Sequence, residues 1–296
     1  MYHMYANLHF HSTHSDGQFT PEELVQIAKK EGYKALALTD HDAATGNAEM
    51  AAICKREGLE YILGAEFYAV GFGFNFHIVG LDFDPEHPKM KEHLDYAGNM
   101  CVYRTKSLFD MAIARGSLKG ITWDEVVEAN PGVKFLCVDH VFHLMRKKGL
   151  LTNADYKAFH RANFSSLIPF ENIYKYRSAE QVISTINEAG GIAILAHPCW
   201  KKPNQFSVVP QLVELGLKGI ETWHRDHTDE EAAEAERLAK KYNLYESGGT
   251  DHAGLMGGQY QFYPDIPENE NPFYVPSLKF GVSEENFRKI KNRVLG

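Results

Sequence analysis

Histidine and acidic side chains recur directly after the predicted β-strands of this chain, and this pattern limits the folds available to it. The first case is the stretch LHFHSTHSDG at residues 8–17, in which apolar residues alternate with His9 and His11. Alternation with a period of two predicts a strand whose two histidines point to the same side. We expect that strand over residues 6–11, with Asp16 in the loop that follows.

Predicted helices and strands alternate along much of the sequence. The first helix has clear boundary signals, because Thr20 is suited to the N-cap, Pro21 to the first position and Glu23 to a capping box, while Gly32 ends the helix. Further strands are expected at residues 34–39, 60–70, 74–83, 190–196, 217–223 and 244–251, with helices ending near Arg56, spanning 228–242 and spanning 284–294. Such alternation favours βα units and a mostly parallel sheet, closed or open.

Composition narrows the class of protein. The net charge of −8 argues against a nucleic-acid-binding surface, so no stable nucleic-acid complex is expected. The four cysteines form no Cys-x-x-Cys pair, which indicates reduced thiols. Neither a signal peptide nor an apolar stretch long enough to span a bilayer is recognisable. We therefore expect a cytoplasmic protein without a membrane partner, and the sequence makes no prediction of its oligomeric state.

The residues at the predicted strand ends are typical metal ligands. The candidate ligands are His9, His11, Asp16, His41, Glu66, His77, His197, Asp251 and His252. In a parallel barrel the carboxyl ends of the strands meet at one face, so these side chains can share a pocket. Imidazoles and carboxylates without thiolates suit Mn²⁺, Zn²⁺ or Fe²⁺, and the number of candidates predicts two or three ions bridged by Glu66 or Asp251.

A lone histidine is more often a structural residue, and five histidines are interpreted in that way. They are His3, His87, His93, His143 and His160. A site with several metal ions, by contrast, has a well-known use. It activates water, holds an anionic substrate and neutralises a leaving oxygen, which is what phosphate esters require.

The ordered motifs resemble those of the PHP (polymerase and histidinol phosphatase) superfamily. The motifs are His9-x-His11 with Ser15-Asp16-Gly17, Thr39-Asp40-His41, Gly64-Ala65-Glu66, Ala196-His197-Pro198 and Gly249-Thr250-Asp251. This resemblance implies an α/β fold, a distorted (β/α)7 barrel, with up to three metal ions and phosphoesterase activity. We expect the barrel at residues 1–83 and 185–296, and a helical insertion at residues 84–184 that covers the site.

The resemblance also implies how the ligands are shared. His9, His11, Glu66 and Asp251 would hold one ion, and Glu66, His77 and His197 a second; Asp16, His41 and a histidine near Asp251 would hold a third. The family usually has Asp-x-His at the last motif, whereas His252 directly follows Asp251 here. Either the loop bends to bring His252 back as a ligand, which we expect, or the third ion is weakly bound or absent.

Further residues are expected around the metal ions. By resemblance, His227 would contact phosphate or protonate the leaving group, and Asp40 would orient a ligand. His224 and His140 are expected to contact substrate. Relatives carry an arginine two residues before the histidine that matches His140, where this chain has Val138. Arg104, Lys201 and Arg225 are the candidates to replace it.

The leading hypothesis is a metal-dependent phosphoesterase that hydrolyses a small phosphorylated metabolite. One candidate substrate is a phosphoribosyl 1,2-cyclic phosphate, cleaved first as a diester and then as a monoester. The alternatives are a nucleoside 3′,5′-bisphosphate or oligonucleotide phosphatase and a histidinol phosphatase. An amidohydrolase is less favoured because no lysine occurs among the strand-end motifs, and a binding module without catalysis is less favoured because so many ligand positions are filled.

Overall fold

The computed structural model describes residues 4–254 and 280–295, whose strands form two sheets. One sheet has the order β1-β2-β3 and the other the order β4-β5-β6-β7-β8. The strands are β1 (Ala6–Asn7), β2 (Ala35–Leu36), β3 (Glu60–Tyr61), β4 (Gly64–Gly71), β5 (Phe74–Leu81), β6 (Ile192–Leu195), β7 (Gly219–His224) and β8 (Tyr245–Gly249).

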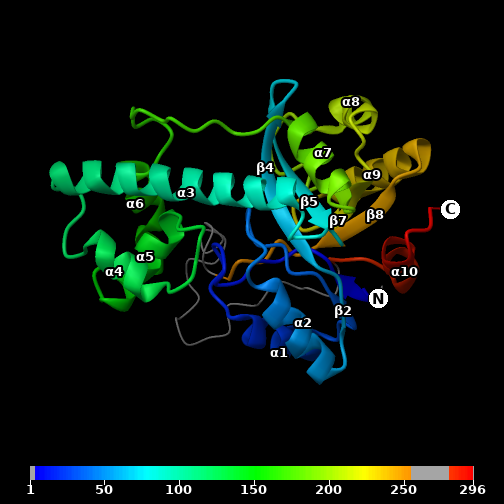
Figure 1. Cartoon of the computed structure of the whole chain (residues 1–296), viewed down its shortest axis with the longest axis horizontal. Helices are drawn as coiled ribbons and strands as arrows, with labels where there is room; N and C mark the ends of the chain where they lie inside the picture. The colour runs from blue at the N-terminus through cyan, green and yellow to red at the C-terminus, as the bar shows by residue number, and fades with distance from the viewer. Residues whose placement is uncertain (1–3, 255–279, 296) are drawn as a thin grey trace.

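Helices surround these sheets and extend beyond them (Figure 1). The α-helices are α1 (Pro21–Glu31), α2 (Asn47–Glu57), α3 (Pro88–Ala114), α4 (Trp123–Ala129), α5 (Val138–Lys147), α6 (Tyr156–Asn163), α7 (Ala179–Glu188), α8 (Val209–Glu214), α9 (Asp229–Tyr242) and α10 (Glu284–Asn292). Two 3₁₀ turns are η1 (Asn153–Asp155) and η2 (Phe206–Val208). No helix among the described residues combines the length and apolar character needed to cross a bilayer.

Helix α1 begins and ends where its sequence signals predict. The Thr20 side chain accepts a hydrogen bond from the backbone N–H of Glu23, and the Glu23 carboxylate accepts one from the backbone N–H of Thr20. Gly32 ends the helix in the left-handed conformation, at φ 92°. Helix α9 likewise begins after Thr228 with the same reciprocal cap. Local hydrogen bonding fixes these boundaries, so they were predictable.

The strand arrangement differs from the expected barrel. The run expected as a single strand at residues 60–70 divides into β3 and β4, which belong to different sheets. Four of the six described pairings are parallel, but β5 runs antiparallel to both β4 and β6. A tight turn through Gly73, at φ 80°, reverses the chain between β4 and β5. The (β/α)7 barrel is therefore not confirmed among the described residues.

Isolated bridges connect the edges of the two sheets. Phe10 pairs with His252 beyond the ends of β1 and β8, and His41 pairs with Glu66 beyond the end of β2. The two sheets also share one apolar core, to which β1, β2, β5, β6 and β8 contribute and against which α10 packs. A second core lies between the five-stranded sheet and the helices α7, α8 and α9. The ends of strands from both sheets therefore lie close together in one region of the molecule.

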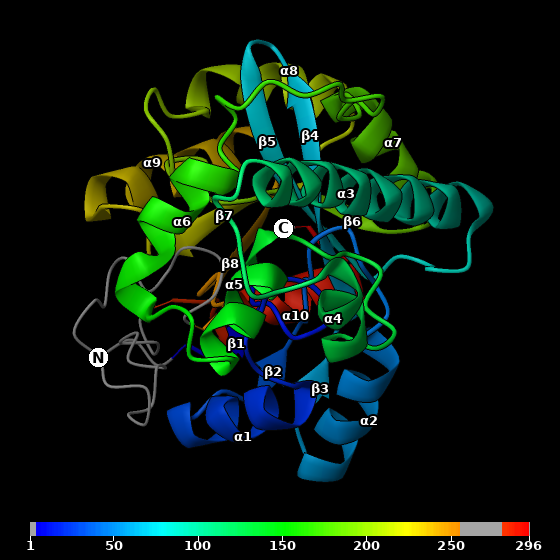
Figure 2. The ribbon, with the colours of Figure 1, turned by 90° about the vertical axis from the view of Figure 1, so that its left-hand side faces the viewer.

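The expected insertion is helical and has its own apolar core. Helices α3 to α6 pack together around residues that include Leu108, Phe142 and Phe159. In Figure 1 the helices α4, α5 and α6 lie to one side of the sheets, and the long helix α3 runs from the sheets toward them; in Figure 2 this side faces the viewer. The expected boundary at residue 184 falls within α7, and α7 packs against the five-stranded sheet.

Candidate metal centre

The predicted ligands reach one region from seven parts of the fold. His9 and His11 follow β1, Asp16 lies in the next loop, His41 follows β2, Glu66 lies in β4, His77 in β5, His197 follows β6 and Asp251 follows β8. Because β5 is antiparallel, His77 approaches from the middle of its strand, where it is paired in register with Tyr68. The structure therefore brings eight of the nine predicted metal ligands together.

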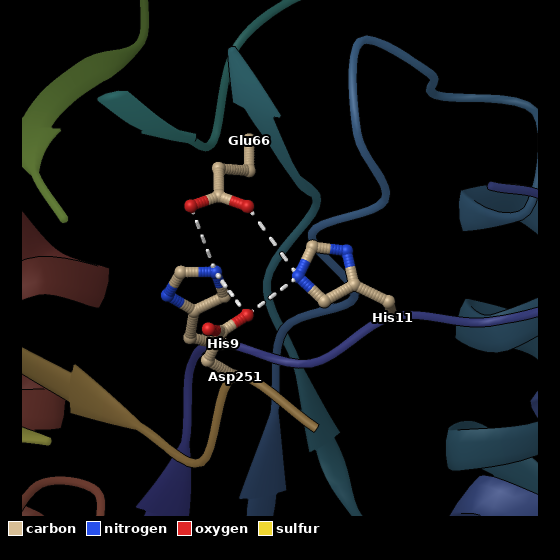
Figure 3. A group of neighbouring side chains, drawn as sticks. All are labelled: His9, His11, Glu66 and Asp251. Atoms are coloured by element: carbon tan, nitrogen blue, oxygen red, sulfur yellow. Dashed lines mark hydrogen bonds and ion pairs between the residues drawn. The ribbon is translucent and has the colours of Figure 1, made fainter. Parts of the chain in front are cut away.

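Glu66 lies at the centre of this cluster. Its carboxylate is fully buried and lies within 3.4 Å of nitrogens from five imidazoles. These belong to His9, His11, His41, His77 and His197 at distances of 3.2, 3.4, 3.1, 3.0 and 2.9 Å. Figure 3 shows His9, His11, Glu66 and Asp251 pointing toward one another, with the two histidines on one segment and each carboxylate on another.

The donor atoms have the geometry of shared metal ligands. Nε2 of His9 and Nδ1 of His41 are buried and have no hydrogen-bond partner among the described residues, although Glu66 oxygens lie 3.2 and 3.1 Å away. Two ligand atoms that share an ion at about 2.1 Å lie roughly 3 Å apart and need not be aligned for a hydrogen bond. The chemistry and spacing of these residues therefore fit divalent metal ions that are bound through imidazole nitrogen and carboxylate oxygen.

Three groups of neighbouring donors can be distinguished at the predicted sites. They are His9, His11, Glu66 and Asp251; His41, Glu66 and His77; and His11, Asp16 and His41. His197 joins the second group through its 2.9 Å approach to Glu66. Glu66 belongs to two of these groups, so its carboxylate would hold two neighbouring ions if both sites were occupied.

Glu221, in β7, is a functional candidate that the sequence analysis did not identify. Its buried carboxylate accepts a hydrogen bond from Nδ1 of His9 at 2.8 Å and another from the backbone N–H of His197 at 2.7 Å. This contact leaves Nε2 of His9 directed at Glu66, which is how a carboxylate fixes the orientation of a metal-binding histidine. An acidic residue inside the apolar strand LKGIETW was the signal available in the sequence.

Asp40 organises the loop that carries Asp16. Its carboxylate accepts hydrogen bonds from the backbone N–H and hydroxyl of Ser12, at 2.7 and 2.8 Å, and from the hydroxyl of Ser15 at 2.7 Å. Asp40 is fully buried, and these contacts use both of its oxygens. These contacts connect Asp40 to a ligand-bearing loop, and its expected orienting role would act through that loop.

The protonation of the cluster is set by burial and by neighbouring charges. Burial opposes ionisation of Glu66 and Asp251, but His9 and the other imidazoles around them hold the pKa of both carboxyls well below the usual range. Burial likewise opposes protonation of His11, but Asp16, Asp251 and Glu66 raise its pKa to about 9. Burial dominates at His77 and lowers its pKa to about 4. The carboxylates and His11 thus hold one another in charged pairs before any metal binds, whereas the low pKa of His77 keeps it neutral.

His252 does not join the ligands in this structure. Its ring lies 6.4 Å from that of Phe19, and its Nδ1 accepts a hydrogen bond from the backbone N–H of Gly254. Asp251 has a φ of 47°, and Ala253 lines the cavity beside the metal ligands. The sharp turn at Asp251 therefore brings residue 253 to the cavity. In this chain residue 253 is an alanine, which cannot bind a metal ion. Residues 255–258 of the loop lie outside the described part.

His224 is buried at the end of β7, and His227 is half-buried just after it. Nε2 of His224 lies 3.9 Å from Asp251, and His224 belongs to two further donor groups, one with His9 and Glu221 and one with Asp226 and Asp251. Nδ1 of His227 donates to the backbone carbonyl of Thr222 at 3.0 Å, and its Nε2 is buried without a partner in the described part of the chain. Burial lowers the pKa of His227, which disfavours the charged form that a proton donor needs.

Only some of the other residues that were expected to contact substrate lie at the cavity. Arg225 lies against the metal cluster, with Nη2 3.5 Å from Asp251, and Arg104 lines the same cavity from α3. The side chain of Lys201 is exposed and stacks over the ring of Trp200 at 3.7 Å. Nδ1 of His140 accepts a hydrogen bond from the backbone N–H of Cys137, so this histidine caps α5. Arg104 and Arg225 are therefore the arginine and lysine residues that line the cavity among those that the structure describes.

The cavity has a volume of about 520 Å³ and lies between the metal cluster and the insertion. Its wall includes Asp16, His41, His77, His197 and Asp251 on the sheet side. The other side includes Arg104, Tyr156, His160, Phe164 and Tyr176 from the insertion. A small molecule held there would meet metal ligands at one end and aromatic and cationic side chains at the other.

A mixed α/β fold with a buried cluster of imidazoles and carboxylates at the floor of a cavity defines a metal-dependent hydrolase. The chain belongs to the PHP domain family, whose sequence model matches residues 7–189. The fold agrees with this membership. A crystal structure of a putative metal-dependent phosphoesterase from Bifidobacterium adolescentis has a TM-score of 0.79 and 24% identity, covering 99% of this chain and 97% of that chain.

Curated relatives extend over most of the chain. A phosphoribosyl 1,2-cyclic phosphate 1,2-diphosphodiesterase of Eggerthella lenta is 29% identical, covering 86% of this chain and 96% of that protein. A 5′-3′ exoribonuclease of Haemophilus influenzae is 32% identical, with coverages of 83% and 88%. A 3′,5′-nucleoside bisphosphate phosphatase of Chromobacterium violaceum is 29% identical, with coverages of 86% and 89%. All three names describe enzymes that act on phosphate esters.

Proposed function

We propose that this protein is a metal-dependent phosphoesterase that hydrolyses a small phosphorylated metabolite, with a phosphoribosyl 1,2-cyclic phosphate as the leading candidate substrate. The observation that carries the proposal is the Glu66 carboxylate, buried among five imidazoles at the floor of a cavity. A relative named for that substrate matches 86% of the chain. No lysine is among the described residues that line the cavity, which supports a phosphoesterase over an amidohydrolase.

The chain would hold two or three divalent ions, Mn²⁺, Zn²⁺ or Fe²⁺, through the ligands assigned above. When bound, such ions supply a nucleophilic hydroxide at neutral pH and stabilise charge on the phosphoryl oxygens. The residues of this chain keep the ligand carboxylates ionised, hold His9 in one orientation through Glu221 and exclude bulk water by burial. A third ion would rely on Asp16, His41 and His11, because His252 lies against Phe19.

Two cations are proposed to orient the substrate. Arg225 lies 3.5 Å from Asp251 and is suited to a phosphoryl oxygen at the metal cluster. Arg104 donates to the hydroxyl of Tyr176 at 3.1 Å and has no described carboxylate partner, so its charge is available to an anionic group at the insertion side. A phosphoribosyl cyclic phosphate carries such a second phosphate. Arg104 would then replace the arginine that relatives have at the position of Val138.

A nucleotide substrate is the second candidate, and the aromatic wall of the cavity favours it. Tyr68, Phe135, Tyr176 and Trp200 line the cavity together with the metal ligands. Aromatic rings can stack on a base, which a phosphoribosyl cyclic phosphate does not possess. Relatives named as an exoribonuclease and a nucleoside bisphosphate phosphatase are consistent with this alternative.

A phosphate-release assay on metal-reconstituted protein tests the proposal. The protein is freed of metal with a chelator, loaded separately with Mn²⁺, Zn²⁺ or Fe²⁺, and given phosphoribosyl 1,2-cyclic phosphate, a nucleoside 3′,5′-bisphosphate, a short RNA and histidinol phosphate. We expect turnover that depends on metal, with the highest kcat/KM for the cyclic phosphate. Highest kcat/KM for the bisphosphate or RNA would select the second candidate, and no metal-dependent release from any of them would overturn the proposal.

The site assignment is tested by alanine substitution at His11 and Glu66. Each change should abolish turnover while the far-ultraviolet circular dichroism remains that of the wild type, because each removes a ligand shared between two donor groups. Glu230→Ala, at an exposed position of α9, is the matched control and should keep full activity. Full activity of His11→Ala or Glu66→Ala would contradict the assignment.

The role of Arg104 is tested with Arg104→Met, which keeps much of the side-chain volume and removes the charge. A hydrogen bond to a charged group contributes about 1.5–3 kcal/mol, so the KM for a substrate with a second phosphate should rise roughly 10- to 100-fold. The KM for a simple phosphomonoester should change little. Equal effects on both kinds of substrate would show that Arg104 does not recognise the second phosphate.

A further inference from the structure

One buried histidine outside the ligand set contacts two side chains that lie next to metal ligands in the sequence. His93 lies in the first turns of α3 and is 2% exposed. Its Nε2 lies 3.5 Å from a carboxylate oxygen of Asp42, whose side chain is 1% exposed. The His93 ring also meets the ring of Phe67 edge to face, with centroids 5.2 Å apart.

The two partners of His93 are the residues that directly follow ligands. Asp42 follows His41, and Phe67 follows Glu66. The backbones of these two segments are themselves joined, because the N–H of Asp42 donates to the carbonyl of Glu66 at 2.8 Å. A single imidazole from the insertion thus packs where the segments bearing His41 and Glu66 meet.

Stability alone gives little reason to keep this polar pair. Both oxygens of Asp42 and both ring nitrogens of His93 are buried and make no hydrogen bond with the described residues. Burying such groups without full pairing has a cost in free energy, and apolar residues of similar volume would often be at least as stable. Asp42 also has a φ of 44°, in a region that most residues avoid. Groups retained under these conditions are candidates for a functional role.

The position of His93 along α3 suggests what that role is. The same helix carries Met100, Arg104 and Leu108, which line the cavity on the insertion side. A contact between the start of α3 and the segments of His41 and Glu66 therefore fixes the cavity wall relative to the metal cluster. Catalysis needs reacting groups held within a fraction of an ångström, so such a connection would affect chemistry as well as folding.

We propose that His93 is a positioning residue, which holds His41 and Glu66 in their metal-binding arrangement through Asp42 and Phe67 and couples the insertion to the metal centre. The inference rests on the metal centre proposed above. It adds a residue that has no direct access to a metal ion and lies in a different part of the fold from the ligands.

The test compares Mn²⁺ binding by metal-free wild-type protein, His93→Ala and His93→Gln, measured by titration calorimetry. Outer residues that orient metal ligands typically affect affinity 10- to 100-fold, and we expect a loss of that size in both variants. His87→Ala is the matched control, because it places the same change in the residue that caps the same helix, and it should bind as the wild type does. A lower melting temperature with unchanged Mn²⁺ affinity would show that His93 is only structural and would overturn the proposal.

A double-mutant cycle keeps the test decisive if His93→Ala does not fold. The effects of His93→Gln and Asp42→Asn on Mn²⁺ affinity should be strongly non-additive, because each change removes the same contact. Additive effects would contradict the coupling. The readout is metal affinity, so a wild-type protein that binds Mn²⁺ but hydrolyses none of the tested esters would refute the proposed function and leave the role of His93 to be decided by the same titrations.

Discussion

At the scale of single residues, the metal centre depends on side chains whose hydrogen bonds restrict what their remaining atoms can do. His9 shows this most clearly. Its Nδ1 is engaged by Glu221 at 2.8 Å, so only Nε2 faces Glu66 and Asp251. Glu221 is also engaged by the backbone N–H of His197, so one buried carboxylate orients two ligand-bearing segments.

Glu221→Gln should weaken metal binding without unfolding the protein. The amide has nearly the same shape, but its neutral oxygen holds the N–H of His9 less firmly, so we expect Mn²⁺ affinity and kcat/KM to fall about 10- to 100-fold. Titration calorimetry and the phosphate-release assay measure these two quantities. Glu230→Gln, on the exposed face of α9, is the control, and an equally small effect of both substitutions would argue against the orienting role of Glu221.

Metal binding should release protons and become tighter as the pH rises. In the metal-free protein, neighbouring carboxylates raise the pKa of His11 to about 9, so this imidazole is mostly protonated at neutral pH. A metal ion binds only the neutral imidazole, so each binding event displaces that proton. Affinity should therefore increase as the pH rises from neutral toward the His11 pKa of about 9. Calorimetry in two buffers with different ionisation enthalpies measures the protons released, and buffer-independent heats would contradict the prediction.

At the scale of secondary-structure elements, helices and strands behaved differently. Helix α1 follows local signals, whereas the strand run at residues 60–70 divides because its two halves pair with different partners: β3 with β2, and β4 with β5. Capping depends on residues three positions apart, while strand pairing depends on segments far apart in sequence. The positions of β5 to β8 were predicted from their apolar runs, whereas the division of residues 60–70 and the antiparallel pairing of β5 were not.

Thr20→Ala should destabilise the fold and leave the metal centre unchanged. The substitution removes one half of the capping box of α1, and the loss of such a cap costs about 1 kcal/mol. Chemical denaturation should show a reduction of that size, with Mn²⁺ affinity equal to that of the wild type. Gln26→Ala, at an exposed position of the same helix, is expected to change stability by less than about 0.5 kcal/mol. Equal stability of Thr20→Ala and wild type would be the contrary result.

At the scale of the whole molecule, the metal centre lies where the two sheets, which share one apolar core, meet the helices α3 to α6, which have a core of their own. Both sheets supply ligands, and residues of the expected insertion line the cavity beside them. Binding of a ligand to the folded state only should therefore stabilise the whole arrangement. The insertion contributes to the site through the cavity wall and through the proposed contact of His93 with Asp42.

Removal of metal should lower the melting temperature, and Mn²⁺ should restore it. At a free concentration about 100 times the dissociation constant, one bound ion adds about 2.7 kcal/mol to the free energy of unfolding. Thermal denaturation after chelation and again after Mn²⁺ addition measures this change, and His11→Ala serves as a control with a reduced response. Identical melting temperatures with and without Mn²⁺ would contradict the metal centre itself.

The sequence by itself determined the chemistry of the site and much of its membership. Imidazoles and carboxylates on or after predicted strands identified eight residues that the structure brings together. Most of them lie near strand ends, which meet in space, whereas His77 lies in the middle of β5. Capping residues likewise determined where α1 begins and ends, since their hydrogen bonds are local.

Only the tertiary structure determined which side chains of distant segments contact one another. Glu221 and His9 are 212 residues apart, and no local pattern relates them. The direction of His252 follows from the turn at Asp251, and the contact of His93 with Asp42 follows from the packing of α3. These features depend on a few ångströms of placement between distant segments, and such placement is set by the packing of the complete fold rather than by neighbouring residues.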